Sequence, residues 1–188
     1  ILQSRKIKTY LVSPVSNLVD MPPFKADFTK SDAELVDYYN SGKITADKLD
    51  SFKDKNSIYY RYLYAKVTGK ANFDELKAIK DADLIPFRIK SGFADFMRDR
   101  YKEIYIDIED SLYKRYGAYI FSNNIFIDHL HFNKRGNFVA ASLIAADLLV
   151  RNEKKQIDFN DTIPLEEKIY DEINLTSVDD IWAYISIN

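Results

Sequence analysis

The sequence predicts an α/β protein of three layers, with a mostly parallel sheet and a helical insertion. Two β-rich stretches, 5–13 and 103–108, are separated by segments with helical periodicity and helix caps. Strand and helix patterns that alternate along a chain are typical of parallel sheets covered by helices. With 188 residues, the chain is also long enough for one sizeable core.

Composition excludes several classes of function. Apolar residues make up 46% of the chain and charged residues 30%, with a formal net charge of −2, so nothing favours nucleic-acid binding. No apolar run approaches the length of a membrane span. The absence of cysteine excludes disulfides and thiol catalysis, and leaves the cellular compartment open. Because only two histidines are present, a zinc ligand set cannot be completed, and we expect neither a metal nor a cofactor.

The first predicted strand, over 5–13, leads into a loop at 15–24. Pro14 ends strand pairing, and the prolines at 22 and 23 stiffen the loop that follows. Ser16 stands in a Ser-Asn pair that is typical of turns, and it lacks the glycine-flanked setting of a catalytic serine. Loops that follow the strands of α/β proteins commonly carry functional sites.

The insertion is predicted at 27–82 and contains helices over 31–40, 45–53, 57–68 and 72–83. Ser31 and Glu34 have the spacing of a capping box at the start of the first helix, and Gly69 ends the third. The last two helices loosely resemble a tetratricopeptide pair, but a single copy does not make a repeat array. We expect the insertion to pack on the core and to shape a substrate cleft.

The remaining chain completes the predicted α/β layers. Helices are expected at 91–101, 110–116 and 138–150, followed by a connector at 152–156 and a last helix at 178–186 that carries Trp182. The resulting division is an α/β part formed by 1–26 and 83–151, the insertion at 27–82, and a C-terminal extension at 152–188.

Both histidines lie in one loop, between the apolar approach 124–127 and an Ala/Leu-rich helix for which Asn133 is a suitable N-cap. Asp128 precedes His131 by three residues, a spacing that lets the two side chains converge in a tight loop. An imidazole can take a proton from a nucleophile and return it, while a carboxylate on its other nitrogen fixes the tautomer. The pattern therefore predicts acyl transfer or ester hydrolysis, with Asp128 and His131 as catalytic residues.

The longer pattern has a family resemblance. Asp128-x-x-His131, an apolar residue, Asn133 and then Gly136 before the helix resembles the last sequence block of the SGNH (GDSL-type) hydrolases. In that family this block supplies the catalytic Asp and His. The resemblance implies that His131 is the general base and Asp128 its orienting carboxylate. Phe132 stands where the family often has proline.

Two further patterns resemble one branch of that family, in which a tetratricopeptide-like helical insertion interrupts the domain. They are Ser-Asn-x-x-Asp-x-Pro-Pro-Phe at 16–24 and Asp-x-x-x-Phe-Arg at 83–88. The resemblance implies that Asn17, Asp20 and Arg88 bind substrate, with Arg88 directed at an anionic group. The alternative for Arg88 is a salt bridge that ties the insertion to the core.

The blocks that carry the nucleophilic serine and the oxyanion-binding Gly and Asn of the family are not found in residues 1–188. The resemblance therefore implies the C-terminal part of a flavodoxin-like three-layer domain, with the N-terminal portion of the same protein as its partner. It implies an acyl ester substrate, on a glycan or a lipid, and favours the bacterial cell envelope or an extracytoplasmic location. Two alternatives stay open: an O-acyltransferase, and a non-catalytic interaction module in which Asp128 and His131 are only structural.

Overall fold

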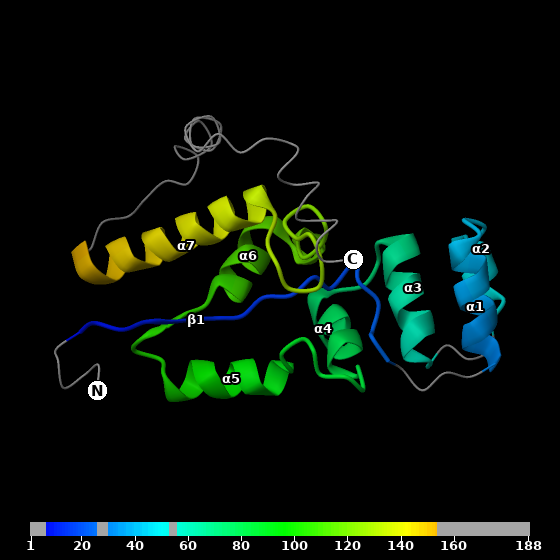
Figure 1. Cartoon of the computed structure of the whole chain (residues 1–188), viewed down its shortest axis with the longest axis horizontal. Helices are drawn as coiled ribbons and strands as arrows, with labels where there is room; N and C mark the ends of the chain where they lie inside the picture. Colours follow the sequence, from blue (N-terminus) through cyan, green and yellow to red (C-terminus); the bar gives the residue numbers. More distant parts are fainter. Residues whose placement is uncertain (1–6, 26–29, 53–55, 154–188) are drawn as a thin grey trace.

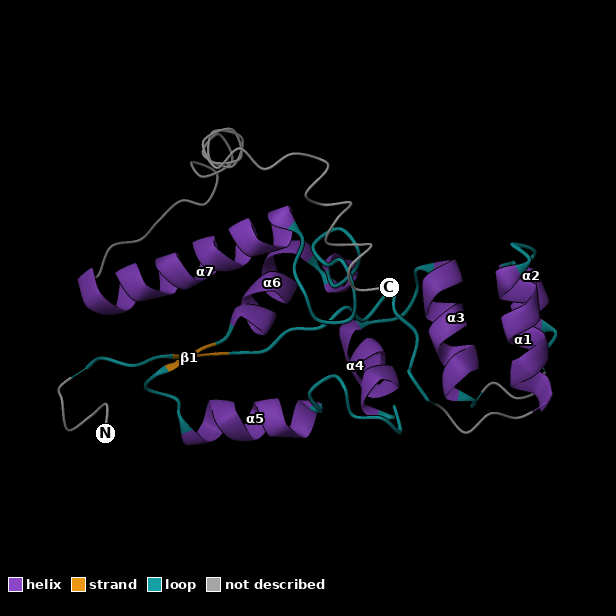
Figure 2. Ribbon diagram, in the orientation of Figure 1, coloured by secondary structure: helices purple, strands orange, loops and turns teal. Residues whose placement is uncertain are grey.

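The computed structural model describes residues 7–25, 30–52 and 56–153, and shows one small sheet with helices on both sides and a further group of helices at one end (Figure 1). Figure 2 colours the two strands orange among the purple helices. The elements, in chain order, are β1 (Leu11–Val12), α1 (Lys30–Asn40), α2 (Ala46–Asp50), α3 (Ile58–Thr68), α4 (Phe73–Asp81), α5 (Ser91–Arg100), β2 (Tyr105–Ile106), α6 (Ile108–Tyr116), the 3₁₀ helix η2 (Ala118–Ile120) and α7 (Lys134–Glu153).

The two strands are parallel, as predicted. Leu11 lies opposite Tyr105 and Val12 opposite Ile106, and the Leu11 N–H donates to the Ile104 carbonyl at 2.9 Å. In the view of Figure 1 the strand pair passes between α7 on one side and α5 on the other. The described part of the chain is therefore an α/β arrangement with a parallel sheet of two strands.

Both strands are shorter than the sequence predicts, because β2 is confined at each end. At its start, the Tyr105 N–H still donates to the Tyr101 carbonyl, at 2.9 Å, in the turn that ends α5. At its end, Asp107 becomes the N-cap of α6 and accepts from the Asp110 N–H at 3.0 Å. Only two residues remain free for pairing with β1.

The helices of the insertion form where the sequence predicts them. The side chains of the N-cap residues each accept from the backbone N–H three residues further on, in α2, α3 and α4, and these caps are Thr45, Ser57 and Asn72. Gly69 ends α3 with a φ of +65°, a left-handed conformation that glycine adopts without strain. Helix α3 contacts α1, α2 and α4 and is the centre of this group.

Two predicted helix boundaries differ from those in the structure, and one predicted helix lies outside the described residues. Helix α1 begins at Lys30, so Ser31, predicted as its N-cap, lies inside its first turn. Helix α7 continues to Glu153, so residues 152 and 153, predicted as part of a connector, are helical, and the rest of the predicted connector lies outside the described residues. The predicted helix at 178–186, with Trp182, lies outside the described residues. None of the helices in the described part is long and apolar enough to span a membrane.

One apolar core extends through the insertion and the sheet layer. Buried side chains of α3 and α4 belong to the same cluster as those that follow β1 and β2. Because the core is continuous, the insertion is held to the sheet layer by apolar burial as well as by polar contacts. The fully buried large side chains of the cluster include Tyr62, Leu63, Leu76, Ile79, Ile106, Leu112, Phe121, Ile125 and Phe126.

The start of α7 is fixed by a cap and by a close contact. The Asn133 side chain accepts from the Gly136 N–H at 2.9 Å, as predicted for an N-cap. Gly136 packs against the backbone of Ile125, and a Cβ at position 136 would collide with the Ile125 carbonyl oxygen and the Phe132 ring. Only glycine fits this contact, which holds α7 against the segment leading to the Asp-His loop.

We expect Gly136→Ala to lower the free energy of unfolding by roughly 1–3 kcal/mol, because the helix must move away from Ile125. Urea denaturation of the variant and the unmodified chain measures this difference. Gly92→Ala is the matched control, since Gly92 lies in the first turn of α5 with no atom near the added Cβ. It should be neutral or stabilising by up to about 1 kcal/mol. Equal effects of the two substitutions would contradict the close contact.

Candidate active site

Asp128 and His131 lie at the tip of a tight hairpin. Its arms are joined by an isolated antiparallel bridge between Phe126 and Phe132, whose rings stack with centroids 5.0 Å apart. The Ile127 N–H donates to the His131 carbonyl at 2.9 Å. Phe126 is fully buried, so the hairpin is anchored in the core while its tip faces solvent. The strand end predicted here is reduced to this one bridge.

Asp128 both shapes the tip and orients the histidine. Its Oδ1 accepts from the backbone N–H groups of Leu130 and His131, each at 2.7 Å, which is an Asx turn. Its Oδ2 lies 2.6 Å from His131 Nδ1. Partial burial acts to raise the pKa of the Asp128 carboxyl, but the hydrogen bonds from His131 and Leu130 outweigh it and hold the pKa below its ordinary value. The carboxylate is therefore charged at neutral pH.

The His131 ring is held at one nitrogen and open at the other. Its side chain is 65% exposed, and Nε2 has no hydrogen-bond partner among the residues that the structure describes. When the ring is neutral, Nδ1–H donates to Asp128 and Nε2 carries the lone pair toward solvent. The predicted convergence of Asp128 and His131 is confirmed, and this arrangement can accept a proton from a hydroxyl group. Its use in catalysis stays a prediction.

His129 makes a different set of contacts. Its ring stacks on Phe24 with centroids 4.3 Å apart and meets the Phe87 ring edge-on at 6.3 Å. Burial lowers the pKa of the His129 imidazole, and the positive charge of Arg88 lowers it further, although a hydrogen bond with the Pro22 carbonyl opposes both. His129 is therefore a neutral, packed side chain at neutral pH.

The loop after β1 is tied to the hairpin and to the insertion. The Asn17 N–H donates to the His129 carbonyl at 2.9 Å, and the Asn17 amide donates to the Asn123 side chain at 2.8 Å. The Asp20 carboxylate accepts from the Asn123 N–H at 2.8 Å and forms an ion pair with Lys66 of α3 at 3.3 Å. These bonds fix the 17–24 loop between the hairpin and α3.

A buried ion pair braces the same loop from its other side. The side chains of Asp83 and Arg88 are each 2% exposed and lie 3.4 Å apart at their closest polar atoms. Asp83 accepts from the Phe24 N–H at 2.8 Å, while Arg88 donates to the carbonyls of Asn17 at 2.9 Å and Met21 at 3.2 Å. The pair joins the end of the insertion to the loop that contacts the hairpin.

The three side chains predicted to bind substrate are thus part of this bracing. Asn17 and Arg88 are buried, and Asp20 is half-buried and engaged with protein groups. Arg88 forms the structural salt bridge that was the second prediction for this residue, and that prediction is confirmed. Of the guanidinium nitrogens, only Nε has no hydrogen-bond partner in the described chain. Contact of Asn17, Asp20 or Arg88 with a substrate stays a prediction. Ser16 is buried as well.

Two bracing residues were missed by sequence reasoning. Asp83 accepts hydrogen bonds from three backbone N–H groups. The only sequence feature that marked it was its place as the first residue of the Asp-x-x-x-Phe-Arg pattern. Asn123 joins the 17–24 loop to the hairpin, and nothing in the local sequence marks it. Both act over long sequence separations, which local patterns do not reveal.

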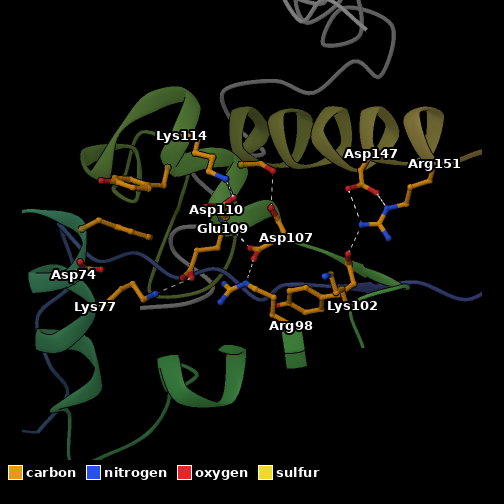
Figure 3. Close-up of a pocket in the computed structure, with 14 residues that line it drawn as sticks. Asp74, Lys77, Arg98, Lys102, Asp107, Glu109, Asp110, Lys114, Asp147 and Arg151 are labelled. Atoms are coloured by element: carbon orange, nitrogen blue, oxygen red, sulfur yellow. Dashed lines mark hydrogen bonds and ion pairs between the residues drawn. The ribbon is translucent and has the colours of Figure 1, made fainter. Parts of the chain in front are cut away.

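A charged cavity of about 690 Å³ lies elsewhere, beside β2 (Figure 3). Its lining alternates acids and bases that pair with one another, including Arg98 with Asp107 at 2.5 Å and Arg151 with Asp147. Neither Asp128 nor His131 lines it. Because its charges are largely balanced, the cavity offers no concentrated field for a charged substrate, and the hairpin remains the candidate site.

Comparison of the chain with protein-family models, with curated proteins and with solved structures gives no match. The support for a function of this chain lies in the motifs of its sequence and in the geometry of the hairpin and its braces. The resemblance to SGNH hydrolases remains a proposal on that basis.

We expect Arg88→Met to lower the free energy of unfolding by roughly 3–5 kcal/mol, because it leaves the Asp83 carboxylate buried without a cation. Urea denaturation measures the loss. Arg100→Met, at the exposed end of α5, is the control and should stay within about 0.5 kcal/mol of the unmodified chain. A loss at Arg88 no larger than that at Arg100 would show that the pair does not brace the loop.

The two histidines allow a direct pH test. We expect the His129 ring to titrate below the ordinary value of about 6.5, because burial and Arg88 disfavour its charged form. The stability that depends on the neutral ring is then complete above about pH 6.5 and is lost as the pH falls through the lower pKa of the folded state. NMR titration measures the pKa, and His129→Gln assigns the signal. Titration at or above 6.5 would refute this packing.

Proposed function

We propose that this chain supplies the Asp-His pair of a serine esterase site of the SGNH type, and that the nucleophile comes from outside residues 1–188. The observation that carries the proposal is the 2.6 Å contact between Asp128 Oδ2 and His131 Nδ1, on a ring that is otherwise open to solvent. A carboxylate on one nitrogen and a free second nitrogen are what a proton-transferring imidazole requires.

In the proposed reaction, His131 Nε2 takes the proton of a serine hydroxyl as the serine oxygen attacks the ester carbonyl. The imidazolium then gives this proton to the leaving alcohol, and an acyl-serine remains. Water, deprotonated by the same nitrogen, attacks the acyl-serine; the bond to the serine oxygen breaks, the imidazolium returns the proton to that oxygen, and the acid is released. Asp128 stays ionised throughout and holds the ring in the required tautomer.

We propose further that β1 and β2 belong to a larger three-layer, flavodoxin-like sheet. Their parallel pairing and the helices α5 and α7 on either side support this fold. In open parallel sheets, ligands bind outside the carboxyl ends of the strands. The loop that follows the carboxyl end of β1 contacts the His129 carbonyl through Asn17, which is consistent with a site at that edge.

The substrate is proposed to be an acyl ester on a lipid or a glycan. Large apolar side chains are exposed on the 17–24 loop and on the segment that follows α4: Phe24, Leu84, Ile85 and Phe87. Phe24 and Phe87 also contact the His129 ring. An apolar surface next to the Asp-His pair is suited to the acyl or lipid part of an ester.

Hydrolysis of p-nitrophenyl acetate tests the proposal, first with the longest polypeptide encoded by the gene and then with residues 1–188 alone. We expect activity only in the longer polypeptide. In it, His131→Ala should reduce kcat/KM by roughly 10⁴-fold or more, and Asp128→Asn by less, because each removes a member of a unit that acts together. His129→Ala should change the rate little, since His129 is packed against Phe24 and not against the dyad.

Two results would contradict the proposal. One is an active longer polypeptide whose rate is unaffected by His131→Ala. The other is a gene product without a serine block and without activity, which would favour the non-catalytic interaction module. If the acyl group passes to an added alcohol faster than to water, the enzyme is an acyltransferase with the same Asp-His chemistry.

A further inference from the structure

The cavity beside β2 has the size of a small-molecule site. Side chains from α4, α5, β2, α6 and α7, or from the turns next to them, line it (Figure 3). Its volume of about 690 Å³ is within the range of ligand pockets, roughly 300–1,000 Å³. Part of the lining is apolar, since the rings of Phe73 and Tyr113 stack there with centroids 4.3 Å apart. Neither Asp128 nor His131 lines the cavity, which is therefore separate from the hairpin.

Most charges of the lining are neutralised by direct contact. Three ion pairs lie within it: Arg98 with Asp107, Lys114 with Asp110, and Arg151 with Asp147. By contrast, the side chains of Asp74 and Lys102 have no ion-pair or hydrogen-bond partner in the described chain. A ligand can therefore bind these two groups without first breaking a contact inside the protein.

Glu109 is the most buried charged group of the lining, with a side chain only 7% exposed. Its nearest cation is Lys77, at 4.0 Å, and its carboxylate accepts no hydrogen bond within the described chain. Burial raises the pKa of the Glu109 carboxyl, and the positive charges of Lys80 and Lys77 offset this only in part. The hydroxyl of Tyr105, which also lines the cavity, is buried with no hydrogen-bond partner among the described residues. Buried polar groups are normally hydrogen-bonded, so both groups indicate a polar ligand.

The unpaired charges are separated across the cavity. In Figure 3, Asp74, Lys77 and Glu109 lie on one side and Lys102 lies on the other. The two acids outnumber Lys77, so their side has an excess of negative charge, while Lys102 makes the other side positive. A ligand that carries one positive and one negative group matches this distribution, whereas a purely anionic or cationic ligand would meet a like charge.

We propose that this cavity binds a zwitterionic small molecule, with its ammonium group at the Glu109 carboxylate and its anionic group at the Lys102 ammonium. An ammonium group supplies both the positive charge and the donors that Glu109 lacks. Lys102 can bind a carboxylate or a phosphate, so a short peptide and a phosphoethanolamine head group share the required chemistry. The inference does not depend on the proposed function, because it concerns a different site.

Isothermal titration calorimetry of residues 1–188 tests the charge requirement. We expect the peptide trialanine, phosphoethanolamine or both to bind with a Kd of about 1 mM or lower. Acetylation of the amine removes the cation, and use of trialanine amide or ethanolamine removes the anion; each change should weaken binding roughly 10-fold or more.

The same titrations distinguish the two sources of the ligand. Binding of trialanine alone assigns the site to peptides, and binding of phosphoethanolamine alone assigns it to the lipid head group; either result upholds a zwitterion site. Absence of saturable binding by both probes, or equal binding of the charged and the blocked forms, would overturn the proposal.

Two variants with matched controls test the named contacts. Glu109→Gln keeps the shape of the side chain but removes its charge, and should weaken binding roughly 10-fold or more. Lys102→Gln, at an exposed position that folding does not depend on, should weaken it roughly 3-fold or more. Glu34→Gln and Lys70→Gln change exposed residues outside the cavity and should leave the Kd unchanged. A Kd unaltered by Lys102→Gln, or by Glu109→Gln that circular dichroism shows to be folded, would contradict the inference.

Amide chemical shifts show where the ligand binds. During titration we expect the largest changes at Lys102, Tyr105 and Glu109, and none at His131. Changes centred on the hairpin instead would mean that the ligand occupies the candidate active site, which refutes a separate site. Esterase activity of the longer polypeptide without zwitterion binding would refute this inference and uphold the proposed function, while binding without activity would do the reverse.

Discussion

The buried pair of Asp83 and Arg88 is the interaction on which the arrangement of the candidate site depends. The 17–24 loop contains two prolines and no regular structure, so its carbonyl groups have no ladder to join. Arg88 provides donors for the carbonyls of Asn17, Met21 and Pro22, and Asp83 accepts the N–H groups that follow. A guanidinium is suited to this role because its donors are fixed in one plane.

From this pair, a short series of hydrogen bonds leads to the dyad. Arg88 holds the Asn17 carbonyl, the Asn17 N–H holds the His129 carbonyl, and two residues later the His131 ring meets Asp128. The histidine side chain can therefore be exposed while its backbone is fixed. A reactive side chain on a rigid support needs little reorganisation when a substrate binds.

The sequence predicted those features whose causes are local. The N-cap at Asn133 and the meeting of Asp128 with His131 involve residues three positions apart, and each is found in the structure. The joining role of Asn123 depends on groups distant in the chain, because its partners Asn17 and Asp20 lie in the loop after β1. Periodicity carries no information on such partners, and only the tertiary arrangement supplies it.

The meeting of the two ends of the helical insertion has a consequence for how the chain folds. The Leu84 N–H donates to the Lys25 carbonyl at 2.9 Å, and Asp83 accepts from the Lys25 N–H at 3.1 Å. Once these bonds form, the two ends of the insertion are joined. The insertion then no longer adds to the length of chain that must be closed into a loop before β1 pairs with β2. Closing a shorter loop costs less chain entropy. The helices of the insertion, whose contacts are short-range, can thus assemble first, and the distant parallel pairing becomes a late and less costly step.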